Sequence, residues 1–149
     1  MDFVHGGTLA AQALREAGID TVFTYLSFDL STSGTQVEEL YLDGSQKQDG
    51  TGNDLANTIV GNDYENKIDG RAGNDTLSGG GGNDSLVGGR GDDDLDGEDG
   101  VDTLNGGKGN DTYYIADNDY VIDESGVDEV IREDGIELGE LGAYDDNKV

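Results

Sequence analysis

Residues 79–100 read GGGGNDSLVGGRGDDDLDGEDG, a stretch made almost entirely of glycine and acidic residues. Glycine loses more conformational entropy on folding than any other residue, and a high like charge adds repulsion, so this composition favours disorder. Apolar residues nevertheless recur at a constant step of nine, at Leu86, Leu95 and Leu104. We therefore interpret the stretch as part of a structural repeat.

The repeat covers residues 52–114 as seven nonapeptides without a gap, from GNDLANTIV to GGKGNDTYY. The first position is glycine in all seven, and the fourth is glycine in the last five but Leu55 and Tyr64 in the first two. The sixth position is always an amide or an acid, in order Asn57, Asn66, Asp75, Asp84, Asp93, Asp102 and Asp111. The eighth is always apolar or aromatic, in order Ile59, Ile68, Leu77, Leu86, Leu95, Leu104 and Tyr113.

This period predicts a coil built from two nonapeptides. The last three residues of each, such as Thr76-Leu77-Ser78, suit a short strand with one inward apolar side chain. The first six suit a tight turn, because glycine accepts positive φ angles and lets backbone carbonyls come close together. Residues 18 apart are then expected to stack in parallel, and residues nine apart to lie on opposite faces of a thin sandwich.

Stacking of this kind places the sixth-position side chains in two columns. One column contains Asn57, Asp75, Asp93 and Asp111, and the other contains Asn66, Asp84 and Asp102. Strand neighbours lie about 4.8 Å apart, so bare carboxylates at that spacing repel one another. A Ca²⁺ ion accepts six to eight carboxylate and carbonyl oxygens at about 2.3–2.6 Å, and it reverses this repulsion. The pattern therefore predicts calcium as the ligand of the acidic columns.

At these residues the sequence resembles the RTX (repeats-in-toxin) family, whose nonapeptide G-G-x-G-x-D-x-U-x forms a calcium-loaded parallel β-roll. GGGGNDSLV, GGRGDDDLD and GGKGNDTYY match every glycine and aspartate position. The resemblance implies that the sixth-position side chains and the turn carbonyls hold Ca²⁺. It implies about three strong sites, between Asp75 and Asp93, Asp93 and Asp111, and Asp84 and Asp102. Two weaker sites with Asn57 and Asn66 would bring the number to five. The implied carbonyl ligands come from Gly70, Ala72, Gly79, Gly80, Gly81, Gly82, Gly88, Gly89, Arg90, Gly91, Gly97, Gly100, Gly107 and Gly109.

The expected fold is all-β, a right-handed parallel β-roll with metal-free β-roll flanks and a short N-terminal capping helix. Residues 1–51 form the predicted cap, with a helix at about 8–17, strands at about 20–30 and 37–42, and a polar connection at 43–51. Phe23 and Tyr41 fall 36 and 18 residues before Ile59 and are expected at the same inward phase.

Residues 1–25 are also similar to the opening of thiamine-diphosphate enzymes. That resemblance is judged not functional, because 149 residues are too few for such a fold.

Residues 115–149 are predicted to continue the roll without metal and to end in a tail. The step of nine runs on from Tyr113 to Ile122 and Ile131, within strand-like segments. Larger apolar side chains are expected to replace the ions there.

Composition excludes several classes of function. The formal net charge of −26 argues against binding to nucleic acid or anionic membranes, because both would repel the chain. Cysteine is absent, and no segment has the length and apolarity of a membrane span. A single histidine, His5, and the lack of a Ser-His-Asp grouping indicate that the chain is not an enzyme. The N-terminus does not read as a cleaved secretory signal, so export is expected to use another route.

Two functional hypotheses remain. In the first, the module is disordered at low Ca²⁺ and folds at extracellular Ca²⁺. The family resemblance then implies a secreted protein that uses type I secretion and belongs to a larger secreted chain. In the second, the roll is a calcium-dependent accessory module that binds a polysaccharide or a surface. Affinity for a glycan would favour the second hypothesis.

Overall fold

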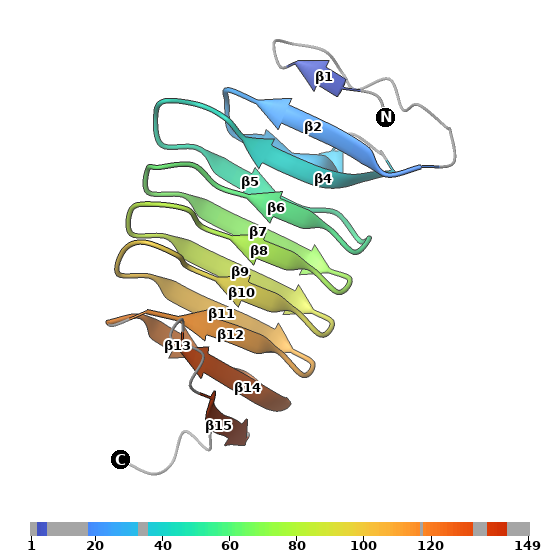
Figure 1. The fold of residues 1–149 in the computed structure, drawn as a ribbon. Coiled ribbons are helices and arrows are strands. Elements are labelled where there is room, and N and C mark those ends of the chain that lie inside the picture. Colours follow the sequence, from blue (N-terminus) through green and yellow to red (C-terminus); the bar gives the residue numbers. More distant parts are fainter. Residues whose placement is uncertain (1–2, 6–17, 33–35, 117, 133–136, 143–149) are drawn as a thin grey trace.

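The computed structural model describes residues 3–5, 18–32, 36–116, 118–132 and 137–142. In this part of the chain the backbone winds as a solenoid, with successive coils stacked along one axis and strands alternating between two facing sheets (Figure 1). The structure confirms the predicted all-β parallel roll. The helix expected at about 8–17 lies outside the described residues.

The two sheets are almost entirely parallel. In spatial order, the larger sheet contains β1 (Phe3–His5), β2 (Asp20–Thr24), β4 (Val37–Leu42), β6 (Thr58–Val60), β8 (Thr76–Ser78), β10 (Asp94–Asp96), β12 (Thr112–Ile115), β14 (Val127–Arg132) and β15 (Glu137–Gly142). The smaller sheet contains β13 (Tyr120–Ile122), β11 (Thr103–Lys108), β9 (Ser85–Arg90), β7 (Lys67–Ala72), β5 (Asp49–Thr51) and β3 (Phe28–Asp29). A 3-10 turn, η1 (Leu30–Thr32), follows β3. Among the strands that the structure describes, only β15 pairs antiparallel, against β14.

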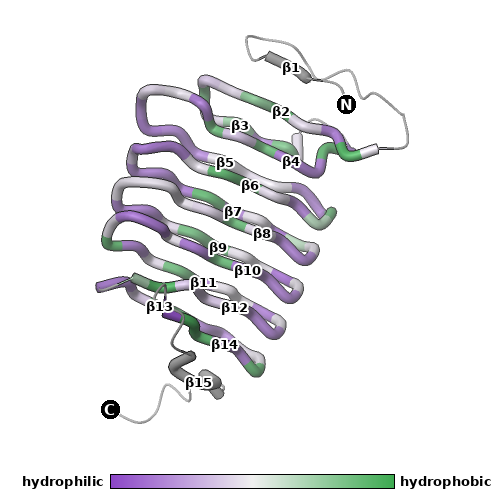
Figure 2. Tube along the Cα trace, in the orientation of Figure 1, coloured by the Kyte–Doolittle hydropathy of each residue, from purple (hydrophilic) through white to green (hydrophobic). Residues whose placement is uncertain are grey.

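The repeat block has the predicted 18-residue register. Leu77 pairs with Leu95 in the larger sheet, and Ile68 pairs with Leu86 in the smaller one. Each eighth-position side chain points between the sheets and is at most 1% exposed. Hydrophilic residues predominate along the turns at both edges (Figure 2). The core thus receives one large apolar side chain from each nonapeptide, and burying each one contributes about 2 kcal/mol.

The N-terminal flank joins the roll one residue out of the predicted phase. β4 has the expected bounds, but the strand expected at 20–30 is divided between β2 and β3, which belong to different sheets. Leu40 pairs with Ile59 at a separation of 19 residues, and Val22 pairs with Leu40. Val22 and Leu40 are therefore the inward residues, and the prediction for Phe23 and Tyr41 was wrong.

An extra residue in the coil between β4 and β6 causes this shift, because the side-chain direction along a strand alternates. Phe23 and Tyr41 instead stack on each other with ring centroids 4.9 Å apart. The same coil contains β5, a short strand within the residues expected to be only a polar connection.

In the C-terminal flank the separation between paired residues is one less than in the repeat block, so the inward positions again differ from those predicted. Leu104 pairs with Val121 and Tyr113 pairs with Val130, both at a separation of 17. Val130 is 5% exposed whereas Ile122 is 51% exposed. The expectation that Ile122 and Ile131 continue the inward step was therefore wrong, because the turn between β12 and β13 is one residue shorter than the repeat turns.

Candidate metal centre

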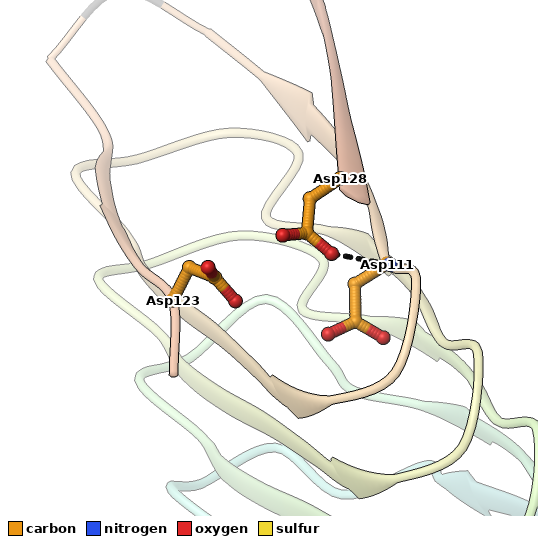
Figure 3. A group of neighbouring side chains, drawn as sticks. All are labelled: Asp111, Asp123 and Asp128. Carbon is orange, nitrogen blue, oxygen red and sulfur yellow. Dashed lines mark hydrogen bonds between the residues drawn. The ribbon is translucent and has the colours of Figure 1, made fainter. Parts of the chain in front are cut away.

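The sixth-position side chains form two columns, one along each edge of the roll. On the first edge, Asn57 N–H donates to Asp75 Oδ1, Asp75 N–H to Asp93 Oδ1, and Asp93 N–H to Asp111 Oδ1, at 2.7–2.9 Å. The first-edge column continues to Asp128, whose Oδ1 accepts from Asp111 N–H at 2.8 Å (Figure 3). These bonds fix one oxygen of each carboxylate against the preceding coil.

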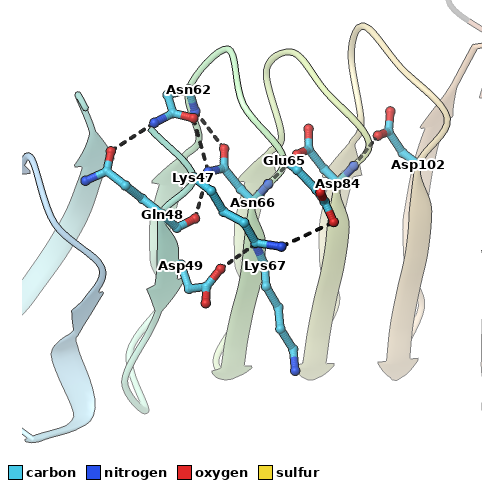
Figure 4. A network of polar contacts seen from close by, with 9 residues as sticks. All are labelled: Lys47, Gln48, Asp49, Asn62, Glu65, Asn66, Lys67, Asp84 and Asp102. Atoms are coloured by element: carbon cyan, nitrogen blue, oxygen red, sulfur yellow. Dashed lines mark hydrogen bonds and ion pairs between the residues drawn. The ribbon is translucent and has the colours of Figure 1, made fainter. Parts of the chain in front are cut away.

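The second edge repeats this arrangement. Asn66 N–H donates to Asp84 Oδ1 and Asp84 N–H donates to Asp102 Oδ1, both at 2.7 Å (Figure 4). The structure thus brings together every sixth-position residue that the sequence indicates, in the predicted columns.

The second carboxylate oxygen of these aspartates is the main feature of the site. Oδ2 of Asp75, Asp84, Asp93 and Asp111 is buried and has no hydrogen-bond partner. The four residues are only 1–3% exposed, and all of them carry this orphaned oxygen toward their own glycine turn. Buried polar atoms in native proteins are almost always satisfied, so a row of orphaned carboxylate oxygens indicates a cation.

The first-position glycines leave the space that these oxygens occupy. A Cβ atom added to Gly70 would lie 2.3 Å from Asp75 Oδ2, and one added to Gly88 would lie 2.3 Å from Asp93 Oδ2. A side chain at the first position would thus collide with the sixth-position carboxylate of the same turn. This explains why the first position is glycine in all seven nonapeptides.

The fourth-position glycines bring neighbouring turns into contact. Gly91 and Gly109 have φ angles of +132° and +139°, in the left-handed region that favours glycine. A Cβ on Gly91 would lie 1.9 Å from the carbonyl oxygen of Gly73, and a Cβ on Gly109 would lie 1.9 Å from that of Gly91. Carbonyl oxygens of successive coils therefore follow one another along the edge, next to the aspartate column.

The residues predicted as carbonyl ligands all lie in the first four positions of nonapeptides that carry a column aspartate, and most of those on the first edge belong to the ends of β7, β9 and β11. On the first edge, with Asp75, Asp93 and Asp111, are Gly70, Ala72, Gly88, Gly89, Arg90, Gly91, Gly107 and Gly109. On the second edge, with Asp84 and Asp102, are Gly79, Gly80, Gly81, Gly82, Gly97 and Gly100. Three of these carbonyls also accept bonds between coils: Gly80 from Asp99 N–H, Arg90 from Gly73 N–H, and Gly107 from Ser125 N–H. Which carbonyls bind an ion stays a prediction.

The two asparagines satisfy their side chains within the protein. Asn57 Oδ1 accepts from Asn53 N–H at 2.8 Å, and its Nδ2 donates to Val37 O at 3.1 Å. Asn66 Oδ1 accepts from Asn62 N–H, and its Nδ2 donates to Gln48 O at 2.7 Å (Figure 4). An amide thus binds the preceding coil in the first two turns without a cation.

Electrostatics in the columns favour neutralisation. Burial raises the pKa of Asp75 to about 7 and the pKa values of Asp84, Asp93 and Asp111 to about 6. The backbone hydrogen bond to each carboxylate lowers its pKa, but by less than burial raises it. The charge of a column neighbour, such as Asp93 beside Asp75, raises it further. Each column therefore takes up protons near neutral pH unless a cation neutralises it.

Sequence reasoning missed two members of the columns, Asp119 and Asp128. Asp119 extends the second edge, and its Oδ1 and Oδ2 accept from Asp102 N–H and Ala116 N–H. Both residues stand 17 rather than 18 positions after their predecessors, which hides them from a strict nine-residue search. For Asp128 the signal was DESGVD at 123–128, which keeps glycine at the fourth position and aspartate at the sixth.

The comparisons with known proteins agree with this geometry. A family model described as the RTX calcium-binding nonapeptide repeat (4 copies) matches residues 51–86 and residues 78–113. No curated protein and no solved structure matches the chain. In the part of the chain that the structure describes, no helix is long and apolar enough to cross a membrane.

Proposed function

We propose that this RTX calcium-binding repeat protein, whose repeats span residues 51–113, is disordered at low Ca²⁺ and folds into its β-roll at extracellular Ca²⁺. The repeats themselves imply a calcium-binding β-roll module, and the family is structural rather than enzymatic. The observation that carries the proposal is the row of buried, unpartnered Oδ2 atoms along the edges.

The residues present fit calcium. Carboxylate and carbonyl oxygens are the donors that this hard cation prefers, and the glycine turns supply both in one place. Asp75, Asp93 and Asp111 would hold ions on the first edge, and Asp84 and Asp102 on the second. A bound ion supplies positive charge between consecutive coils, where Asp75, Asp84, Asp93 and Asp111 otherwise keep an oxygen without a partner.

The roll is expected to need calcium because its small core has to offset a large negative charge and the ordering of many glycines. The core is thin, the net charge is −26 and 26 glycines must be ordered, so the metal-free roll is marginal at best. Extracellular calcium modules have dissociation constants of about 10⁻⁴–10⁻³ M. At 1 mM Ca²⁺ each such site adds about 0.4–1.4 kcal/mol by linkage. Three to five sites therefore add about 1–7 kcal/mol, which at its upper end is comparable with the whole stability of a small domain.

Folding that depends on calcium also indicates where the protein acts. RTX repeats typically occur in secreted proteins, which supports an extracellular location for this chain. A chain that is unfolded at cytosolic Ca²⁺ suits passage through an export channel, and folding outside makes the passage one-way. We accordingly place the module in a larger secreted protein that leaves the cell by the type I route.

A Ca²⁺ titration of the purified chain by far-UV circular dichroism tests the proposal, with Mg²⁺ as the control ion. The expected result is a cooperative transition from coil to β-structure near millimolar Ca²⁺ that Mg²⁺ does not produce. A chain that is fully folded in EDTA and indifferent to Ca²⁺ would refute the proposal. It would also leave glycan binding as the hypothesis to test.

A further inference from the structure

The last coil of the roll carries a group of three carboxylates that the repeat block does not have. Asp111 precedes β12, Asp123 follows β13, and Asp128 lies in β14. One carboxylate oxygen from each of the three lies within 4.8 Å of the other two. Figure 3 shows the three side chains converging on one space from three separate stretches of backbone.

The oxygens of this group lack hydrogen-bond partners. Asp128 is 0% exposed and Asp111 is 1% exposed, yet Oδ2 of each is unpartnered. Both oxygens of Asp123 are also buried and make no hydrogen bond of good geometry, although the backbone N–H groups of Ser125 and Glu124 lie near enough to lower the pKa of this carboxyl. The other oxygens of the two buried residues are used within the column: Asp111 Oδ1 accepts from Asp93 N–H, and Asp128 Oδ1 accepts from Asp111 N–H. The oxygens that face the common space are thus left for a ligand.

Asp123 occupies a position that is glycine everywhere else in the repeat. Val121 is aligned with Leu104 in the sheet, so Asp123 corresponds to Gly106, the first position of its turn. A Cβ on Gly106 would lie 2.1 Å from Asp111 Oδ2. In the last turn the side chain of Asp123 is placed beside Asp128 instead. The turn therefore has a carboxylate where each repeat turn has only an α-hydrogen.

From this juxtaposition we propose that Asp111, Asp123 and Asp128 form a terminal Ca²⁺ site of a kind distinct from the repeat sites. Oxygens up to 4.8 Å apart can share one ion with Ca²⁺–oxygen distances of about 2.4 Å, whereas Mg²⁺ requires about 2.0–2.1 Å. Three carboxylates bring a formal charge of −3, against −2 for a pair of column aspartates. Calcium affinity rises with ligand charge, so this site fills before the repeat sites.

The site goes beyond the proposed function, because it depends on residues outside the repeat block and on a ligand position that the block lacks. Its physical effect is to attach the last coil to the roll. Asp123 follows a strand of the smaller sheet and Asp128 lies in a strand of the larger one. An ion between them joins the two sheets at the C-terminal end, in addition to bridging two coils.

Isothermal titration with CaCl₂ and hydrogen exchange of residues 127–132 test this proposal on the full chain. Asp123→Asn is the test variant, and Glu124→Gln is the matched control, because Glu124 is the exposed neighbour and loses the same charge. We expect the wild-type chain and Glu124→Gln to bind a first ion on the order of tenfold more tightly than the rest. In Asp123→Asn this first ion is lost, and amide protection in β14 falls while the repeat strands keep theirs.

Two results would overturn the proposal. One is that Asp123→Asn binds calcium as Glu124→Gln does. The other is that protection of β14 in the wild-type chain depends on pH but not on Ca²⁺, which would mean that the carboxylates share a proton instead of an ion. Asp93→Asn, measured in parallel, separates this proposal from the proposed function. If the repeat sites are absent, Asp93→Asn leaves binding unchanged while Asp123→Asn still removes the first ion.

Discussion

Replacing Asp93 with asparagine should stabilise the metal-free roll and remove part of the stabilisation that calcium adds. Asp93 is 1% exposed and stands in the middle of the first-edge column, between Asp75 and Asp111. Asparagine has nearly the same shape and keeps an oxygen that can accept from Asp75 N–H. The substitution therefore removes one negative charge at the predicted ligand position and leaves the packing in place.

The magnitude with calcium follows from linkage. At 10 mM free Ca²⁺, a site with a dissociation constant of about 1 mM adds about 1.4 kcal/mol to the free energy of unfolding. Asp93 would contribute to two sites, one with each column neighbour. Asp93→Asn should therefore reduce, by about 3 kcal/mol, the rise in the free energy of unfolding between EDTA and 10 mM Ca²⁺, measured in urea titrations at pH 7.5.

Without calcium, Asp93→Asn should raise the free energy of unfolding of the roll. Burial raises the pKa of Asp93 from 3.8 to about 6, so ionising it in the metal-free roll costs about 3 kcal/mol. Asparagine removes this cost. In EDTA, Asp93→Asn should therefore fold more readily than the wild-type chain, which far-UV circular dichroism would report as more β-structure at a given pH.

Asp94→Asn is the control, because Asp94 is the adjacent exposed residue and loses the same charge. It should change the free energy of unfolding by less than about 0.5 kcal/mol in either condition. Two results would refute the reasoning. One is that Asp93→Asn behaves like Asp94→Asn, and the other is that it destabilises the roll equally in Ca²⁺ and in EDTA.

Three further perturbations test separate parts of the structure. Gly88→Ala would place a Cβ atom 2.3 Å from Asp93 Oδ2. It should therefore lower the free energy of unfolding in urea by about 1–3 kcal/mol and weaken calcium binding. Gly81→Ala is the control, because its Cβ would lie no closer than 3.4 Å to other atoms, and it should do neither. Because the column pKa values are raised to about 6–7, the metal-free roll binds more protons than the unfolded chain. In EDTA, β-structure should therefore increase as the pH falls from 7.5 to 5 and be lost as the pH rises again. In calcium, the concentration needed for folding should rise over the same fall in pH, because protons compete with the ion; a pH-independent midpoint would count against carboxylate ligands. Arg71→Gly should raise the midpoint temperature of unfolding, because Arg71 has a φ angle of +79° and a left-handed non-glycine residue costs roughly 1–2 kcal/mol. Arg90→Gly is the control: it removes the same charge from a residue without a positive φ angle and should not raise the midpoint.

The repeat block could be predicted from sequence because its physics is local and periodic. Glycine at the first position and aspartate at the sixth occupy one small space, so neither can change without affecting the other. Leu77, Leu95 and their counterparts at the eighth position fill the core as one row from each sheet, and their spacing fixes the 18-residue register. A nine-residue count was therefore enough to find the columns and the inward residues.

The flanks could not be predicted in the same way, because a single inserted or missing residue changes which side chains face inward. One residue more before β6 makes Leu40 inward instead of Tyr41, and one fewer before β13 makes Val121 inward instead of Ile122. A search that allows one gap finds Asp128. The same search places Asp123 at the first position, where the repeat has glycine, but only the structure shows that its carboxylate lies within 4.8 Å of those of Asp111 and Asp128.

A crystal structure of the chain grown in 10 mM CaCl₂, with anomalous differences used to locate calcium, tests the central claim most directly. The expected result is a row of ions along both edges, each against Oδ2 of column aspartates such as Asp75, Asp84, Asp93 and Asp111. No ion is expected between Asn57 and Val37, where the amide already binds the backbone carbonyl. Well-ordered aspartate columns whose Oδ2 atoms contact only water or protein donors would contradict the claim.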